Sequence, residues 1–360
     1  MILQFFHLDG SLLILISLLC GVGLLVLYSA SGESVRIVNR QAMHLAAAYA
    51  GMLLLAQVSP QTLQRWSPWL FLLGLLALLA VLLFGEIGKG AQRWINLGFI
   101  RFQPSEMMKL AVPMMVAWYL SAFAMPPRSM RILMAMLLVL VPCVMIGMQP
   151  DLGTAILVGS AGFFVLFFAG MRLRLIAGLL VVAGTMVPVM WYFFMHAYQR
   201  QRVLTFLNPE SDPLGSGYHI IQSKIAIGSG GLYGKGWLNG SQSQLDFLPE
   251  SSTDFIFAVF GEEFGWFGVV MLLLLYLLVV IRGLMIAANS QDRYARMLAG
   301  SLSMTFFVYL VVNVGMVTGM LPVVGVPLPL VSYGGTSAVT LMLGFGILMS
   351  IQSDRRLLAR

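Results

Sequence analysis

The sequence contains few charged residues. Only 10% of its 360 residues are charged, 59% are hydrophobic, and the mean hydropathy is +0.90. So few charges cannot cover the surface of a water-soluble domain, because soluble globular domains carry about 25% charged residues. This composition excludes a soluble protein and makes the lipid bilayer the expected solvent for most of the chain.

Cysteine and histidine are scarce as well. Both cysteines, Cys20 and Cys143, lie inside apolar runs, where cysteine behaves as a small apolar residue, so no disulfide framework is expected. The four histidines are scattered and lack the spacing of metal ligands. Basic patches with interleaved aromatic residues are also absent, so the net charge of +7 does not indicate a nucleic-acid partner.

The sequence is rich in long apolar runs. Ten of them are long enough to cross about 30 Å of hydrocarbon, and they leave little chain for a soluble domain. We therefore predict an all-α polytopic membrane protein, in which residues 1–360 form a single integral membrane domain with about ten transmembrane helices. The runs lie near residues 11–30, 43–58, 68–85, 105–123, 129–148, 154–170, 174–194, 255–281, 295–319 and 334–351.

The charges are distributed unequally between the two sets of connecting segments. One set carries eleven arginines and three aspartates, whereas the other carries eleven of the fourteen acidic residues. By the positive-inside rule the arginine-rich side is cytoplasmic. An even number of helices then puts both termini in the cytoplasm of a multi-pass protein of the cytoplasmic membrane. The arginines are Arg65, Arg128, Arg131, Arg172, Arg174, Arg282, Arg293, Arg296, Arg355, Arg356 and Arg360.

The longest connection, residues 195–253 between predicted helices 7 and 8, is expected to be extracytoplasmic. Its many aliphatic and aromatic residues argue against disorder, so we expect it to fold over the outer face. A helix is predicted over residues 216–227, with Ile220 and Ile225 among the residues of its apolar side. The glycines of segment 228–236 do not match a nucleotide-binding motif, and they favour tight turns and close backbone approach over phosphate binding.

Asp254 is the most informative charge, because it stands directly before the apolar run 255–281. An ionised carboxylate at the start of a membrane helix costs free energy, so such a residue is expected to have a function. The preceding loop carries Lys224, which could help to hold a phosphorylated or sugar-bearing ligand. Glu262 follows eight positions after Asp254 and returns to about the same helical face, so we expect the two carboxylates to share a cavity. This pattern favours an enzyme or a transporter.

A second group of charges lies before and within the fourth run. Arg93 and Arg101 precede it, while Glu106 and Lys109 are three positions apart, on one helical face, and able to form an ion pair. An ion pair that faces the interior of the bundle leaves no unpaired charge in hydrocarbon. It either stabilises the packing of the helices or orients a substrate. Asp151, just before another run, is expected to cap that helix.

The entry to the last run is broken by prolines. Pro322, Pro327 and Pro329 precede the sequence Ser-Tyr-Gly-Gly-Thr-Ser of residues 332–337. Irregular backbone at membrane depth must line a cavity or be buried in protein. We therefore predict a re-entrant-like segment next to a polar cavity.

Six stretches of this sequence resemble motifs of the SEDS family (shape, elongation, division and sporulation) of bacterial membrane proteins, and its elongation members in particular. Ser252 departs from the pattern, because relatives usually have His at that place, so a proton-relay role for this position is not expected. The stretches are AQRWINLG at 91–98, QPSEMMK at 103–109, QPDLGT at 149–154, QSKIAIGSGG at 222–231, FLPE and TDFIFA within 247–258, and PLVSYGG at 329–335.

The resemblance implies a peptidoglycan glycosyltransferase that polymerises lipid II into glycan strands at the outer face of the cytoplasmic membrane during cell elongation. It also implies a class B penicillin-binding protein as partner. Asp254 matches the essential catalytic carboxylate of the family, and Glu106 and Lys109 match a functional ion pair below the cavity. The expected substrate-binding residues are Arg93, Arg101, Lys224, Glu250 and Glu262.

The reaction transfers a glycan from an undecaprenyl-diphosphate donor, with inversion at the anomeric carbon, so it requires a base and positive charge for the leaving diphosphate. Asp254 is expected to act as the base or to hold a divalent cation such as Mg²⁺ or Mn²⁺, and the sequence leaves both roles open. Arg93, Arg101 and Lys109 are candidates for stabilising the diphosphate. No organic cofactor is expected.

A lipid II flippase, or another transporter of lipid-linked substrates, is the main alternative function. Many spans with inward charges and proline-broken helices fit a transporter as well. Against it, the charges gather at one face of the membrane, and no pair of repeated broken helices is found. A noncatalytic scaffold would account for the spans but not for Asp254. The apolar outer side chains serve membrane lipids and a partner helix equally well.

Overall fold

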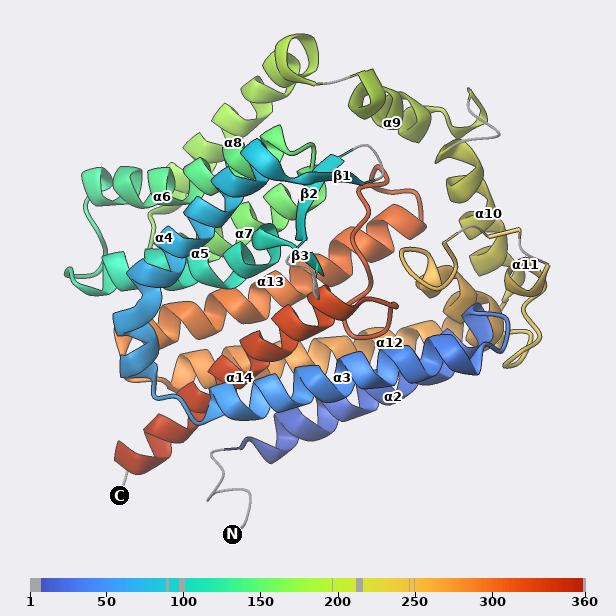
Figure 1. Cartoon of the computed structure of the whole chain (residues 1–360), viewed down its shortest axis with the longest axis horizontal. Helices are drawn as coiled ribbons and strands as arrows, with labels where there is room; N and C mark the ends of the chain where they lie inside the picture. The colour runs from blue at the N-terminus through green and yellow to red at the C-terminus, as the bar shows by residue number, and fades with distance from the viewer. Residues whose placement is uncertain are drawn as a thin grey trace.

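The computed structural model describes residues 8–358 apart from 89–90, 97–100, 196, 212–215, 246 and 249. The described chain is mostly helical (Figure 1). The long helices are α2 (Gly10–Ala30), α3 (Val35–Ala56), α4 (Pro60–Phe84), α5 (Pro104–Ser121), α6 (Ser129–Met148), α7 (Leu152–Phe168), α8 (Leu173–Val189), α12 (Ile256–Asn289), α13 (Arg293–Val317) and α14 (Gly335–Leu358).

Several helices begin where the sequence supplies a capping side chain. The carboxylates of Asp9, Asp151 and Asp292 accept the main-chain N–H groups that open α2, α7 and α13. Ser59 does the same for α4, in which Pro60 occupies the first turn. These caps satisfy N–H groups that have no partner inside the helix, so polar residues between apolar runs fix where these four helices start.

Each of the ten predicted apolar runs overlaps one of these helices, with ends that differ by up to about two helical turns, which supports an all-α polytopic integral membrane protein. Within the described residues, six helices are long and apolar enough to cross a membrane by length and composition alone, and the shorter α7 is also apolar. The total of ten transmembrane helices therefore stays a prediction. Large hydrophobic side chains such as Leu54 and Phe84, which are 73% and 85% exposed, suit a surface covered by lipid.

The sequence did not predict the small antiparallel sheet between α4 and α5. It consists of β1 (Glu86–Gly88), β2 (Ala91–Asn96) and β3 (Arg101–Phe102), in the order β1-β2-β3. The strands are too short to produce a recognisable alternation of apolar and polar residues. The sheet is a small addition to a fold that is otherwise all-α, as predicted.

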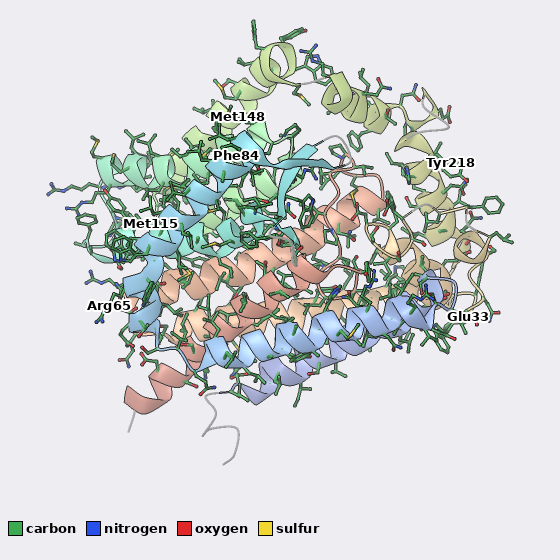
Figure 2. All side chains as sticks on the ribbon, in the orientation of Figure 1. Glu33, Arg65, Phe84, Met115, Met148 and Tyr218 are labelled. Carbon is green, nitrogen blue, oxygen red and sulfur yellow. The ribbon has the colours of Figure 1, made fainter. Side chains whose placement is uncertain are left out.

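The helices form two groups, one on each side of a central pair. Figure 1 shows α13 and α14 in the middle, α2, α3 and α12 on one side, and α4 to α8 on the other. Both termini lie at one end of this bundle. Arg65, from the arginine-rich set, lies near that end, and Glu33 lies at the opposite end (Figure 2). These two side chains, one from each predicted set of connections, thus lie at opposite ends of the bundle. The side of the membrane that each end faces stays a prediction.

The long connection 195–253 contains α9 (Ala197–Leu207), the short 3-10 helix η2 (Pro209–Ser211), α10 (Ser216–Ser229) and α11 (Ser241–Gln244), and it follows a single π-helical turn, η1 (Met190–Phe194). The predicted helix at 216–227 is confirmed by α10. Ile220 is buried on it, whereas Ile225 is 45% exposed, so the assignment of Ile225 to an apolar side at the membrane interface stays a prediction. The helix is anchored by Ser223, whose hydroxyl donates to the Val317 carbonyl over 2.8 Å.

Helix α12 is interrupted at Gly265, which has φ +64° and ψ −167°. The interruption leaves main-chain groups on both sides of Gly265 without helical hydrogen-bond partners. The loop after α10 supplies partners to these groups. Four main-chain hydrogen bonds of 2.9 to 3.0 Å join the two segments: Lys235 N–H to Glu262 O, Gly236 N–H to Glu263 O, Trp266 N–H to Gly231 O and Phe267 N–H to Leu232 O.

The glycines of the loop permit this pairing. A side chain at Gly230 would meet the Gly261 carbonyl, and one at Gly234, whose φ is +80°, would meet the Glu263 carbonyl. Close backbone approach, the interpretation favoured from the sequence, is therefore confirmed at these glycines. The pairing fixes the first part of α12, which carries Asp254 at its entrance.

Candidate functional site

Asp254 lies in a turn that leads into α12. The turn is closed by the Glu250 carbonyl, which accepts the N–H groups of Thr253 at 3.1 Å and Phe255 at 3.3 Å. Asp254 itself is half-buried. Its main-chain carbonyl accepts a hydrogen bond of 2.9 Å from Nδ2 of Asn313, a fully buried residue of α13. The position of the carboxylate is thus set by its own turn and by a neighbouring helix.

The segment 318–334, between α13 and α14, holds the same turn from another direction. Its Ser332 hydroxyl donates to the Thr253 carbonyl over 2.5 Å, and the Tyr333 N–H donates to the Ser252 carbonyl over 2.9 Å. Residues 322–334 form no regular helix or strand, although most of them are buried or half-buried. The predicted irregular, re-entrant-like entry to the last helix is therefore confirmed as a buried, non-helical segment.

Segment 318–334 is itself tied to two helices. Gln41 of α3 accepts the Gly334 N–H over 3.2 Å and donates to the Ser332 carbonyl over 3.4 Å. From α12, the buried Tyr276 hydroxyl donates to the Pro329 carbonyl over 2.6 Å. These bonds satisfy irregular backbone inside the bundle and make the segment a rigid support for the Asp254 turn.

Gly325 lies beside the carboxylate of Asp254. A Cβ atom built at Gly325 would be 3.5 Å from Oδ2 of Asp254, and the glycine has φ +72°, which disfavours any side chain there. Glycine at this position therefore brings the segment 318–334 close to the carboxylate and leaves one side of it without a side chain.

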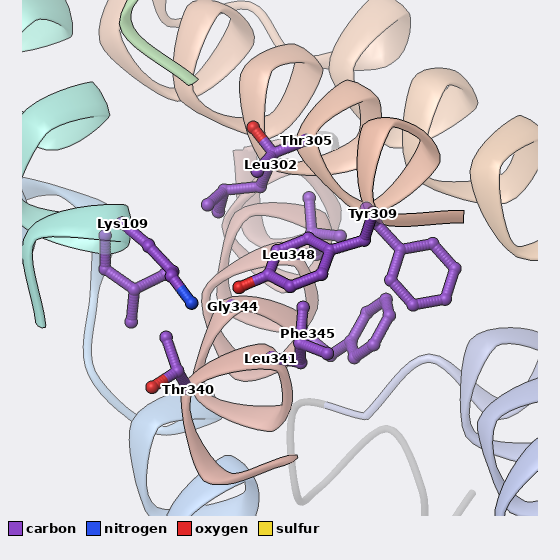
Figure 3. Close-up of a pocket in the computed structure, with 11 residues that line it drawn as sticks. Lys109, Leu302, Thr305, Tyr309, Thr340, Leu341, Gly344, Phe345 and Leu348 are labelled. Atoms are coloured by element: carbon purple, nitrogen blue, oxygen red, sulfur yellow. The ribbon is translucent and has the colours of Figure 1, made fainter. Parts of the chain in front are cut away.

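Glu106 and Lys109 form the ion pair that their spacing predicted. Nζ of Lys109 lies 2.5 Å from Oε1 of Glu106, and both residues are buried. The same ammonium lies 5.0 Å from the centre of the Tyr309 ring. It faces a mostly apolar pocket between α5, α13 and α14, where the polar ends of Lys109 and Tyr309 point toward each other (Figure 3).

Arg93 is engaged by the start of α7. Its guanidinium donates to the Pro150 carbonyl over 2.9 Å and lies 3.6 Å from the Asp151 carboxylate, which also accepts a bond from Gln103. Asp151 caps α7 through the Thr154 N–H, as predicted. Arg93 thus joins the strand β2 to α7. The side chain of Arg101 lies outside the described residues, so its predicted role stays a prediction.

Glu262 contacts the loop after α10. Its carboxylate is fully buried and lies 2.6 Å from Lys235, with further bonds from the Ser241 hydroxyl and the Gln242 N–H at 3.0 and 3.1 Å. These contacts do not support the expectation that it shares a cavity with Asp254. Because α12 begins at Ile256, Asp254 lies in a turn outside the helix, so helical spacing does not place the two carboxylates on one face. Their sharing of a cavity stays a prediction.

The other two predicted residues are more exposed. Lys224 lies on α10, where its side chain passes over Gly319 of segment 318–334. Glu250 closes the Asp254 turn with its carbonyl, and its carboxylate accepts the Thr253 hydroxyl over 2.8 Å. Their roles in substrate binding stay predictions.

Asn313, Ser332, Gly325 and Tyr309 support the site but were not predicted as site residues. An amide within the apolar run of α13 was a usable signal for Asn313, because a polar group at that depth needs a partner. Among the described residues, no group of three or more His, Cys, Asp or Glu side chains could hold a metal ion. The arrangement instead offers one rigidly placed carboxylate beside an open main-chain segment.

Known proteins match this chain over nearly its whole length. The FtsW/RodA/SpoVE family profile, described as cell cycle protein, matches residues 10–357. The chain is 51% identical over 354 residues to the peptidoglycan glycosyltransferase MrdB of Escherichia coli (strain K12), covering 98% of this chain and 96% of that protein. It is 34% identical to stage V sporulation protein E of Bacillus subtilis (strain 168), covering 97% and 98%.

Solved structures share the fold. The rod shape determining protein RodA of Thermus thermophilus has a TM-score of 0.74 and 29% identity, with 97% of each chain covered. A chain of a peptidoglycan synthase complex that coordinates polymerization and crosslinking has a TM-score of 0.84 and 30% identity, covering 97% of this chain and 98% of that one. The protein therefore belongs to the FtsW/RodA/SpoVE family, which is the SEDS family that its motifs indicated.

Proposed function

We propose that this protein is a peptidoglycan glycosyltransferase that polymerises lipid II at the outer face of the bacterial cytoplasmic membrane during cell elongation, with Asp254 as its catalytic carboxylate. The activity rests on 51% identity to a peptidoglycan glycosyltransferase over 98% of this chain. The residue assignment rests on one structural observation. Three separate parts of the chain, namely the Glu250 turn, Asn313 of α13 and segment 318–334, hold the main chain on either side of Asp254.

This support suits a catalytic group. The turn is held by hydrogen bonds to its main-chain atoms. These bonds fix the position of the half-buried Asp254 carboxylate. A reacting group gains most when it is held in position before the substrate arrives, because no reorganisation is then needed in the transition state.

In the proposed reaction, a sugar 4-hydroxyl of the incoming lipid-linked disaccharide attacks the anomeric carbon of the undecaprenyl-diphosphate-linked glycan. The new glycosidic bond forms as the bond to the diphosphate breaks, with inversion at that carbon. Asp254 accepts the proton of the attacking hydroxyl. The leaving diphosphate carries the negative charge away and requires nearby cations.

Asp254 is also the residue that would hold a divalent cation. Mg²⁺ is commonly bound by one or two carboxylates together with the phosphates of a substrate, so a full cluster of protein ligands is not required. When bound, such a cation would neutralise charge on the departing diphosphate. The base and cation-ligand roles can be separated by titrating Mg²⁺ and Mn²⁺ into a polymerisation assay of the Asp254→Glu variant.

We also propose that the site faces outward, that both termini are cytoplasmic, and that a class B penicillin-binding protein works with this chain. The sidedness is supported by the eleven arginines of one set of connections and by the common position of the termini at one end of the bundle (Figure 1). The partnership is supported by similarity to a chain of a peptidoglycan synthase complex. The substrate-binding candidates remain those named from the sequence, namely Arg93, Arg101, Lys224, Glu250 and Glu262.

The test is polymerisation of lipid II by the purified protein, scored as glycan strands on a gel. Asp254→Asn should abolish product while leaving the melting temperature unchanged, whereas Glu33→Gln, an exposed acid at the same end of the bundle, should keep normal activity. Normal polymer from Asp254→Asn would exclude Asp254 as the catalytic residue. A liposome assay of lipid II flipping, run in parallel, tests the transporter alternative.

A further inference from the structure

A second pocket lies at the opposite end of the bundle from α10 and α11, where α13 begins and where α5 and α7 end. Its volume is about 420 Å³. Part of its wall is apolar, with Met125, Phe168 and Met297 among the lining residues, and Arg293 and Arg296 also line it. The pocket thus combines two cationic side chains with an apolar wall.

Both arginines are positioned by main-chain carbonyls. Arg293 donates to the Phe123 carbonyl over 2.9 Å, and Arg296 donates through two nitrogens to the Ser290 carbonyl over 3.2 and 3.1 Å. A guanidinium has five N–H donors, so each retains donors beyond these bonds. Within the described part of the chain, the four ion pairs involve neither arginine. Their positive charges are therefore not neutralised by a carboxylate in contact.

The surroundings of the pocket are basic. Arg128 and Arg131 lie in and after the connection that follows α5, and Arg172 and Arg174 follow α7. The nearest acid in sequence is Asp292, whose carboxylate caps α13 by accepting the Ala295 N–H over 2.9 Å, and it does not line the pocket. An anionic ligand is the complement of this surface.

The depth of the pocket identifies the kind of anion. Arg293 is the first residue of α13, which is long and apolar enough to cross a membrane, so both arginines lie where a helix leaves the hydrocarbon for the headgroup layer. Basic pockets between transmembrane helices at this level bind the headgroups of anionic lipids. A free phosphate would use the arginines but would leave the apolar wall without a partner.

We propose that this pocket is a binding site for an anionic phospholipid, whose phosphate contacts Arg293 and Arg296 and whose acyl chain begins along Met125 and Phe168. The arginine fork matches the oxygens of a phosphate, and the apolar wall matches the first methylenes of the chain. The site is separate from the Asp254 turn, and its test does not depend on glycosyltransferase activity.

The experiment measures lipid binding to the full-length protein in detergent by native mass spectrometry. The probes are dioleoyl-phosphatidylglycerol and dioleoyl-phosphatidylcholine, which share acyl chains and differ in net charge. The unmodified protein should prefer phosphatidylglycerol. Arg293→Gln/Arg296→Gln should weaken that binding about tenfold or more, from the energy of two basic contacts. The control Arg172→Gln/Arg174→Gln removes equal charge from exposed residues outside the pocket and should change binding about twofold or less.

Equal binding of both lipids, or equal losses in the two variants, would overturn the proposal. Glycerol phosphate that displaces phosphatidylglycerol at equal concentration would also overturn it, by showing that the apolar wall contributes nothing. If the pocket variant fails to fold, photoactivatable phosphatidylglycerol on the unmodified protein replaces it. Labelling should then concentrate on peptides that contain Met125, Phe168 or Met297, and labelling confined to other peptides would reject the site.

Discussion

Asn313 joins Asp254 to the segment that follows α13. Its Nδ2 donates to the main-chain carbonyl of Asp254 over 2.9 Å and to that of Val326 over 2.8 Å. One fully buried amide therefore holds the catalytic candidate against the residue next to Gly325, which flanks the Asp254 carboxylate. Tyr309, which contacts Lys109, is one turn earlier on the same face of α13, so this helix links the ion pair to the Asp254 turn.

We predict that Asn313→Ala lowers the polymerisation kcat by about 10²-fold with little change in KM, because small displacements of a reacting group have effects of that size. The buried Val326 carbonyl would lose its donor, at a cost of about 1 to 3 kcal/mol, and the half-buried Asp254 carbonyl would lose the same donor. Steady-state kinetics and thermal unfolding in detergent check both effects. Asn239→Ala, an exposed asparagine of the loop, is the matched control. Unchanged kcat in a folded Asn313→Ala protein would show that the amide is structural only.

A second prediction concerns the buried pair Glu106 and Lys109. Removing either partner leaves an uncompensated charge inside the bundle, so Glu106→Gln and Lys109→Met should each destabilise the protein by about 3 to 5 kcal/mol. The double variant should be more stable than the sum of the two changes predicts, with a coupling of about 1 kcal/mol or more. Thermal unfolding of the four proteins gives this coupling directly.

The same double variant separates the two interpretations that the sequence left open. If the pair only stabilises the packing of the helices, the double variant should recover polymerisation together with stability. If the pair orients substrate, the double variant should fold and remain inactive.

The sequence predicted what depends on local composition. The apolar runs correspond to the helices, and Asp151 caps α7 as its place before an apolar run predicted. Asp254 and the pair Glu106 and Lys109 were identifiable because an ionised side chain is costly near hydrocarbon. Such signals require no knowledge of which segments meet.

The sequence could not predict contacts between distant segments. Asn313 and Asp254 are 59 positions apart, and the sequence around either residue does not indicate that the other is its partner. Gly265 lies in a run that is typical of a continuous helix, since glycine is tolerated there, so the break in α12 was missed. Glu262 was assigned by helical spacing from a residue that lies outside the helix.

A third prediction follows from the burial of Glu262. Its carboxylate accepts hydrogen bonds from Lys235, Ser241 and Gln242 of the loop after α10. Hydrogen bonds to a charged group contribute about 1.5 to 3 kcal/mol, so Glu262→Gln should weaken them and make this loop more mobile. Limited proteolysis within 231–245 should then accelerate about tenfold or more. Glu210→Gln changes an acid in the same long connection and should leave the cleavage rate unaltered. Equal cleavage of both variants would mean that the main-chain pairing alone holds the loop.

The interruption of α12 leads to a fourth prediction. Gly265 has a combination of φ and ψ that is essentially confined to glycine, and a Cβ there would come within 2.8 Å of the Leu232 carbonyl. Gly265→Ala should therefore destabilise the protein by about 3 kcal/mol or more, through strain and loss of the main-chain pairing. Gly147→Ala is the control, because Gly147 is helical, a methyl group added there would meet no atom within 4 Å, and alanine favours a helix by about 1 kcal/mol. Thermal unfolding should move in opposite directions for the two variants, and a tolerated Gly265→Ala would mean that α12 can run unbroken and present Asp254 without the loop.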